Sequence, residues 1–225
     1  MTFSIAARCP ETGQFGIAIS SSSIAVGARC PWLVPGVGAV STQNITLPSL
    51  GPETLALMEQ GLAPAEALDK VLTRNGYSQY RQITAIDHLG RTAHFSGAQT
   101  LGNHNAVSGE QCVAAGNMLA DRAVIEAMVE AFEHGEGQLA DRLLAAMKAA
   151  IAAGGEAGPV HSAAMVVVGE LTWPIINLRV DWADENPIGE LEKLWDAYRP
   201  QVQDYIDRAL APDKSPGYGV AGDDR

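Results

Sequence analysis

Thr2 is the first residue whose type and position suggest chemistry, because it follows Met1 and opens a β-prone run. A small residue after an initiator methionine permits removal of that methionine, which leaves a free α-amine on the next residue. An α-amine has a pKa of about 8, so part of it is the free base at neutral pH, beside the hydroxyl of the same threonine. Thr2 could therefore act as nucleophile and base in amide hydrolysis, although many proteins begin Met-Thr without such a role.

Four consecutive serines, residues 20–23, end the second predicted strand. If the first two strands form a hairpin, this run lies across from Thr2. Ser22 and Ser23 are then candidates for orienting the nucleophile or its amine. The alternative is a solvated strand end that leads into a turn.

Two further groups of polar residues follow predicted strands. Thr42, Gln43 and Asn44 offer a hydroxyl and two amides that could hold an oxyanion or a substrate amide, while ordinary turn formation explains them equally well. Asn117 follows Gly116, a residue that allows the backbone to approach another group closely. We therefore expect Asn117 to contact substrate, with a tight turn as the alternative.

Basic residues are scarce in the first fifty positions, where only Arg8 and Arg29 occur. Either could bind a substrate carboxylate, although arginine more often has a surface role. With Glu11 the segment has a net charge of +1, whereas the whole chain of 225 residues carries −11. Acidity therefore belongs mainly to the predicted helices and tail, and an anionic small substrate is not excluded.

Several classes of function are disfavoured. A pI of about 4.8 argues against nucleic-acid binding, and no apolar run reaches the length of a membrane span. The chain lacks glycine-rich phosphate loops and the GxSxG motif, and its start does not resemble a signal peptide, so we expect a cytoplasmic protein. We expect no cofactor and no metal, and the three cysteines do not form a disulfide framework: Cys9, Cys30 and Cys112.

The order of predicted elements indicates an α+β protein with helices that cover sheet faces. We expect one domain over residues 1–211 and an irregular tail over 212–225. Residues 24–35 are predicted to form a loop or short strand. The other predicted strands cover 2–8, 15–23, 36–44, 81–88, 91–97, 110–115, 162–168 and 173–181. The predicted helices begin at 51 and 64 and cover 121–134 and 138–153, and a last one begins at 187, is broken at Pro200 and resumes to about residue 210.

Several segments together resemble the bacterial and archaeal family DUF1028, in consistent order from residue 2 to 198. They are TFSIAARCPETGQFGIAISSSSIAVGARCPW, GVGAVSTQN, GPETLALMEQGLAPAEAL, GNML and INLRVDWADENPIGELEKLW. This resemblance implies membership of the N-terminal nucleophile (Ntn) hydrolases, whose fold is a four-layer αββα sandwich. It also implies that Thr2 matches the position of the nucleophile.

The resemblance is incomplete at the site. Proteasome-like members of the wider class have an acidic residue after the second strand and a lysine further on. Here serines occupy that stretch, and Arg29 is the nearest basic residue. The proton-transfer arrangement of those members therefore does not transfer directly.

The leading hypothesis is an Ntn-type amidohydrolase that acts on a small amide or peptide-like substrate, with no nucleic-acid or membrane partner. By analogy, we expect a homo-oligomer such as a dimer. The rival hypothesis is a non-catalytic ligand-binding or assembly protein on the same scaffold. A third is metal-assisted hydrolysis through His88, His94 or His104.

Overall fold

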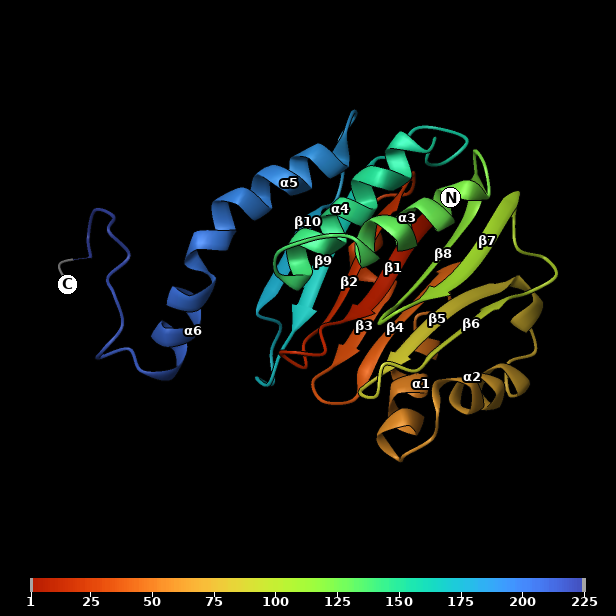
Figure 1. The fold of residues 1–225 in the computed structure, drawn as a ribbon, viewed down its shortest axis with the longest axis horizontal. Coiled ribbons are helices and arrows are strands. Elements are labelled where there is room, and N and C mark those ends of the chain that lie inside the picture. The colour runs from red at the N-terminus through yellow and green to blue at the C-terminus, as the bar shows by residue number, and fades with distance from the viewer. Residues whose placement is uncertain (1, 224–225) are drawn as a thin grey trace.

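Two antiparallel sheets form the centre of the molecule in the computed structural model, which describes residues 2–223 (Figure 1). The six-stranded sheet has the order β10 (Ile176–Val180), β9 (Ser162–Val168), β2 (Phe15–Ser21), β1 (Thr2–Arg8), β8 (Cys112–Leu119) and β7 (Asn103–Gly109). The four-stranded sheet has the order β3 (Pro31–Val34), β4 (Gly38–Asn44), β5 (Arg81–Asp87) and β6 (Thr92–Ser96).

Helices pack against both sheets (Figure 1). The apolar residues of α3 (Ala123–Glu133) and α4 (Leu139–Ala152) share one core cluster with β1 and its neighbours. Those of α1 (Leu50–Glu59) and α2 (Pro64–Thr73) share another with β4 and β5. The remaining helices are α5 (Pro187–Tyr198), α6 (Val202–Leu210) and the short 3₁₀ helices η1 (Val26–Ala28), η2 (Ser78–Tyr80) and η3 (Arg199–Gln201).

A third cluster lies between the two sheets, because successive side chains of a strand point to opposite faces. On β1, Phe3 and Ile5 pack with the helices, whereas Ala6 packs in the cluster between the sheets. We call the space between the sheets the inter-sheet layer. Its apolar half comprises Ala6, Phe15, Ile17, Ile19, Val26, Cys30, Ala39, Ile86, Val113, Ala164 and Val168, and its polar half comprises Thr2, Ser4, Ser21, Ser41, Gln43, Gln82, Asn117 and Ser162, all of them buried.

Most predicted strands and helices occur within a few residues of their expected bounds, and the predicted hairpin of β1 with β2 is present. The predicted strand 15–23 ends at Ser21, so Ser22 and Ser23 lie in the following turn. The sequence reading was wrong to miss β7 and to end its neighbour near residue 115, since β8 continues through Gly116 and Asn117 to Leu119.

Gly116 is needed where β8 passes beneath α3. A Cβ atom at this position would lie 2.7 Å from Cδ2 of Leu119 and 2.9 Å from Cδ1 of Ile125. Such contacts are too short for carbon atoms, so a side chain here would require the ends of the Leu119 and Ile125 side chains to shift. The expected close approach at Gly116 is thus present, and the next residue, Asn117, lies on β8 within the inter-sheet layer.

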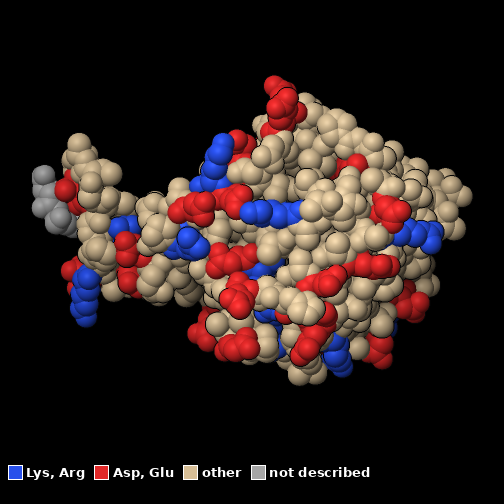
Figure 2. Space-filling view, turned by 45° about the horizontal axis from the view of Figure 1, so that its top comes forward, with Lys and Arg blue, Asp and Glu red and all other residues tan. Residues whose placement is uncertain are grey.

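The C-terminal arm, formed by η3, α6 and the segment after it, extends away from the sheets (Figure 1). No residue of α6 is buried, and Arg208 donates hydrogen bonds to the carbonyls of Pro216 and Gly217. Acidic side chains are spread over the face shown in Figure 2, interspersed with fewer basic ones. Within residues 2–223, no helix has the length and apolar character needed to cross a membrane.

Candidate functional site

A chain of hydroxyl groups begins at Thr2, the first residue of β1. The antiparallel register of β1 and β2 places Thr2 beside Ser21, and the two side-chain oxygens lie 3.2 Å apart. The Ser21 oxygen lies 2.9 Å from that of Ser23, which in turn accepts a 2.6 Å hydrogen bond from Nη2 of Arg29. Three hydroxyls therefore connect the start of β1 to a guanidinium group.

The Arg29 guanidinium is held in place by backbone carbonyls. Its Nη1 donates to the carbonyl of Ile24 at 2.5 Å and to that of Ala25 at 3.1 Å. No carboxylate of the described residues lies within ion-pair distance of this guanidinium. Its positive charge is therefore directed at Ser23 without being neutralised by an acidic neighbour.

Ser162, the first residue of β9, fixes the turn that carries these serines. Its hydroxyl donates to the Ser23 carbonyl at 2.6 Å and accepts from the backbone N–H of Val26 at 3.3 Å. The preceding residue, His161, stacks on Trp182 at a ring separation of 4.4 Å, and its Nδ1 lies 2.9 Å from a backbone carbonyl. These contacts give His161 a structural role at the strand end.

Glu156 is the one site residue with a strongly perturbed carboxyl group that the sequence gave no reason to expect. It bridges Leu119 at the end of β8 and is 6% exposed, and neither carboxyl oxygen has a hydrogen-bond partner of normal geometry among the described residues. Burial raises its pKa to about 8, while Ser22 acts on the pKa in the opposite direction. Burial therefore shifts this carboxyl group toward its protonated form.

Asn117 joins the start of β1 to a buried network of amides. It pairs with Thr2 across the strands, and its Nδ2 donates to Oε1 of Gln82 at 3.0 Å. The same oxygen accepts from Nε2 of Gln43 at 2.9 Å, and Oε1 of Gln43 accepts from the Ser4 hydroxyl at 2.7 Å. Oδ1 of Asn117, however, is buried and has no hydrogen-bond partner among residues 2–223.

The predicted site residues divide into two sets. Thr2, Ser22, Ser23, Arg29 and Asn117 lie together at this end of the sheet, and the amide network connects Gln43 to them. The others lie elsewhere or are bonded to the protein itself. Arg8 ends β1 and donates to Gln111, Thr42 donates to the Leu47 carbonyl, and Asn44 donates to the Tyr80 carbonyl and accepts from the Leu101 N–H.

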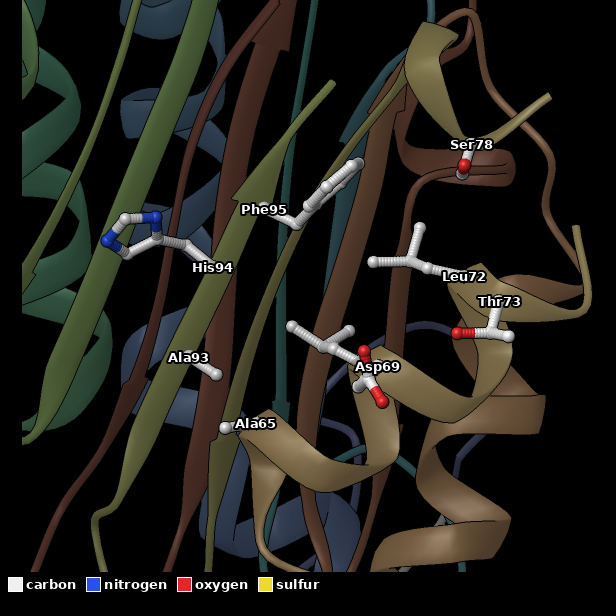
Figure 3. Close-up of a pocket in the computed structure, with 9 residues that line it drawn as sticks. Ala65, Asp69, Leu72, Thr73, Ser78, Ala93, His94 and Phe95 are labelled. Atoms are coloured by element: carbon white, nitrogen blue, oxygen red, sulfur yellow. The ribbon is translucent and has the colours of Figure 1, made fainter. Parts of the chain in front are cut away.

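Two of the three cysteines, Cys30 and Cys112, are buried. Burial raises the pKa of Cys112 to about 12 and also raises that of Cys30, so these thiols stay protonated. No three His, Cys, Asp or Glu side chains within residues 2–223 are grouped to hold a metal ion. His94 points away from the 320 Å³ hollow between α2 and β6 (Figure 3), and His88 is exposed on a turn.

The sequence matches a family model over residues 2–191, described as a family of unknown function, DUF1028. The chain belongs to the DUF1028 family. Every residue of the candidate site lies within the matched range, which ends inside α5. The DUF1028 match therefore includes the site and leaves out the C-terminal arm.

A solved DUF1028 structure, protein SPO2555 from Silicibacter pomeroyi, is 35% identical and has a TM-score of 0.84, with coverage of 92% of this chain and 93% of that chain. Anbu (ancestral beta-subunit) from Yersinia bercovieri is 10% identical, with 97% and 100% coverage and a TM-score of 0.43. An Anbu mutant from Hyphomicrobium sp. strain MC1 is 12% identical, with 92% and 100% coverage and a TM-score of 0.41. The Anbu scores are too low to bear on this chain, and no curated protein matches its sequence.

Proposed function

We propose that this DUF1028 protein is an Ntn-type amidohydrolase that cleaves a small amide or peptide-like substrate, with Thr2 as the nucleophile once Met1 is removed. Met1 lies outside the described residues. The observation that carries the proposal is the hydroxyl chain from Thr2 through Ser21 and Ser23 to Arg29. With helices on the outer face of each sheet, we also propose the four-layer αββα arrangement of that class.

The Arg29 guanidinium gives the hydroxyl chain a direction, because it can only donate hydrogen bonds. Ser23 accepts from Arg29, and in the Ser23–Ser21 and Ser21–Thr2 pairs either oxygen could donate; we propose the direction in which Ser23 donates to Ser21 and Ser21 donates to Oγ1 of Thr2. Thr2 then accepts from Ser21, and in the proposed mechanism its own hydroxyl proton passes to the α-amine during the attack. A hydrogen bond of this kind also stabilises negative charge that develops on the attacking oxygen.

The reaction has two steps. Oγ1 of Thr2 attacks the substrate carbonyl carbon, and the hydroxyl proton passes to the α-amine, which returns it to the leaving nitrogen as the C–N bond breaks. The resulting ester on Thr2 is attacked by water, which gives a proton to the α-amine. That proton returns to Oγ1 of Thr2 as the ester breaks, so the enzyme is restored and the net reaction is amide plus water to acid plus amine.

Two further residues have proposed roles in positioning. Glu156, whose pKa is raised by burial, would offer a hydrogen-bond donor near the strand end and keep a second negative charge away from the developing oxyanion. Asn117 presents its unpartnered Oδ1 to the α-amine or to a substrate N–H. The amide network behind Asn117 fixes the orientation of this side chain.

The test compares turnover of Thr2→Ala and Thr2→Ser chains with the parent on a panel of small amides, after intact mass has shown whether Met1 is absent. We expect no turnover in Thr2→Ala, measurable turnover in Thr2→Ser, and melting temperatures within a few degrees of the parent. Turnover by a chain that retains Met1, or unchanged turnover in Thr2→Ala, would contradict the proposal.

A second candidate function is non-catalytic ligand binding on the same scaffold. It is favoured by the burial of Thr2, whose side chain and backbone together are only 6% exposed. Under this candidate, ligands that raise the melting temperature are recovered chemically unchanged from the parent chain lacking Met1. Under the amidohydrolase proposal, amide ligands are recovered as acid and amine.

A further inference from the structure

Arg81, the first residue of β5, carries a buried positive charge on the helix-facing side of the four-stranded sheet. Its side chain lies on the same face of β5 as those of Ile83 and Ala85, which pack with the apolar residues of α1 and α2. The next residue, Gln82, points into the inter-sheet layer, where it belongs to the amide network. Strand alternation therefore separates Arg81 from Thr2, and a site at Arg81 is independent of the hydroxyl chain.

The guanidinium of Arg81 lacks a counterion. The residue is 8% exposed, and its Nη1 donates to the Ile45 carbonyl. Its Nε is buried without a hydrogen-bond partner among residues 2–223, and no carboxylate in that range forms an ion pair with it. A buried cation without an acidic partner is costly, which is a reason to look for an anion from outside the chain.

A hollow of about 490 Å³ adjoins this guanidinium. Arg81 lines it together with four apolar and aromatic residues, Ile45, Tyr77, Tyr80 and Leu101. Each of these four is between 39% and 66% exposed, although large apolar side chains more often gather in a core. An exposed apolar patch around one buried cation, with a volume typical of small-molecule sites, indicates a site for a ligand that is apolar with one anionic group.

Asn44 fixes the walls of the hollow. It has a positive φ of 70°, its Nδ2 donates to the Tyr80 carbonyl at 2.6 Å, and its Oδ1 accepts from the Leu101 N–H at 3.2 Å. Ile45 follows Asn44 in the chain, so this one side chain connects three of the segments that form the hollow. The walls are set by the fold before any ligand binds, which lowers the ordering cost of binding.

The charges of the lining select one class of anion. Arg81 is the one charged residue among the five that line the hollow, and its planar guanidinium matches the geometry of a carboxylate. A single guanidinium balances one carboxylate but leaves a phosphate dianion with excess negative charge. A free amino acid would also bring an ammonium group, and none of the five lining residues is acidic. The rings of Tyr77 and Tyr80 favour an aromatic group beside the carboxylate.

We propose that this hollow is a binding site for a small aromatic monocarboxylic acid that has no amino group. The carboxylate lies against Arg81, and the aromatic ring contacts the apolar lining beside Tyr77 and Tyr80. Because the hollow and Thr2 lie on opposite faces of the four-stranded sheet, binding of the acid does not depend on the proposed amidohydrolase function.

The test measures binding of 3-phenylpropionate to the full chain by calorimetry, with 3-phenylpropionamide and phenylalanine for comparison. We expect the acid to bind at least about tenfold more tightly than either, because the amide lacks the charge and phenylalanine adds an unpaired ammonium group. Arg81→Gln should remove the preference for acid over amide, whereas the control Arg74→Gln, at an exposed arginine outside the hollow, should retain it. Equal affinity for acid and amide, tighter binding of phenylalanine, no binding of 3-phenylpropionate, or equal effects of the two substitutions would overturn the inference.

Tyr77→Ala tests the hollow without altering the buried arginine, whose replacement could disturb folding. Tyr77 is 66% exposed, so the melting temperature should stay close to that of the parent. We expect binding of 3-phenylpropionate to weaken by about fivefold, because one aromatic wall is lost, while the acid is still preferred over the amide. Thr2→Ala should bind the acid as tightly as the parent does. Parent affinity in Tyr77→Ala, or loss of binding in Thr2→Ala, would place the acid elsewhere and contradict the inference.

Discussion

The two halves of the inter-sheet layer are equally buried but chemically opposite. The apolar half contains side chains such as Phe15, Ile17 and Ile86, which contact one another without polar groups. The polar half contains Ser4, Gln43 and other hydroxyls and amides at similarly low exposure. Both halves are formed by the same strands, so the difference lies in the residues at the two ends of each strand.

This difference separates stability from function. Burial of apolar surface stabilises the fold at about 25 cal/mol per Å². Buried amides and hydroxyls add little net stability even when they are hydrogen-bonded, and they are costly when a partner is missing. In the polar half, Oδ1 of Asn117 has no partner among the described residues, and burial raises the pKa of Glu156, which bridges the end of the same strand. We infer that these groups serve chemistry, because they do not favour folding.

The largest expected effect is in the apolar half. Phe15→Ala removes a ring that is 1% exposed, so we expect the free energy of unfolding to fall by about 3–5 kcal/mol in a denaturation experiment. Phe95→Ala, at a half-buried ring on β6, is the control and should cost less than half as much. Turnover at a temperature where Phe15→Ala remains folded should stay near that of the parent; a selective loss of turnover would show that the two halves are not separable.

The next effect is in the amide network. Gln82→Leu leaves Nδ2 of Asn117 and Nε2 of Gln43 without their shared acceptor, and each such buried donor costs about 1–3 kcal/mol. We therefore expect a loss of about 2–4 kcal/mol in the free energy of unfolding, together with a fall in turnover. The control is Gln79→Leu, at an exposed position two residues before β5, and it should change neither the free energy of unfolding nor turnover. Equal effects of the two substitutions would show that the amide network has no special role.

The raised pKa of Glu156 predicts that the stability of the fold depends on pH. Its pKa is about 8 in the folded chain against 4.5 as the ordinary value. The folded chain thus retains a proton that the unfolded chain loses, so this stabilisation is present below pH 4.5 and is lost as the pH rises through 8. The difference in the free energy of unfolding between Glu156→Gln and the parent should therefore shift in favour of Glu156→Gln as the pH rises from 5 to 9, by on the order of 1–3 kcal/mol. Melting temperatures measured across this pH range check the prediction.

The matched control for Glu156 is Glu126→Gln, at an exposed position of α3. Its difference from the parent should vary little over the same pH range. If Glu156→Gln and Glu126→Gln show the same pH profile, Glu156 is ionised in the folded protein and its proposed role as a hydrogen-bond donor is wrong.

The smallest expected effect on stability comes from Ser23→Ala. Ser23 is exposed, so its loss should change the free energy of unfolding by less than about 1 kcal/mol. It also connects Arg29 to Ser21, so turnover should fall by about 10–100-fold. The control is Ser49→Ala, at an exposed serine whose hydroxyl makes no capping bond, and it should retain parent turnover. Parent turnover in Ser23→Ala would show that the hydroxyl chain is not needed for catalysis.

The sequence predicted those parts of the fold that have a strong local pattern. The apolar run of β9 and the spacing of apolar residues in α3 and α4 correspond to elements within one or two residues of their expected bounds. By contrast, β7 has the sequence NHNAVSG, with neither an apolar run nor regular alternation. Its strand conformation depends on pairing with β8, which no local pattern reveals.

The site was predictable to a similar extent. Thr2 and the serines could be placed together because a hairpin brings strand ends into register. Glu156 and Gln82 could not, because their significance depends on burial and on partners distant in the sequence. The alternating pattern of β5 does show Gln82 and Thr84 on the face that carries Ile86, and polar residues on a buried face are the signal that would have pointed to the network.

The central claim, that Thr2 is a nucleophile at the polar end of the inter-sheet layer, is tested most directly by covalent labelling. Native protein is incubated with an acylating β-lactone, whose ring opens on a nucleophilic oxygen, and the intact protein and its peptides are then weighed. We predict one added reagent mass on an N-terminal peptide that begins with Thr2, and none in Thr2→Ala. Labelling at another residue, or no labelling of a chain that begins with Thr2, would contradict the account.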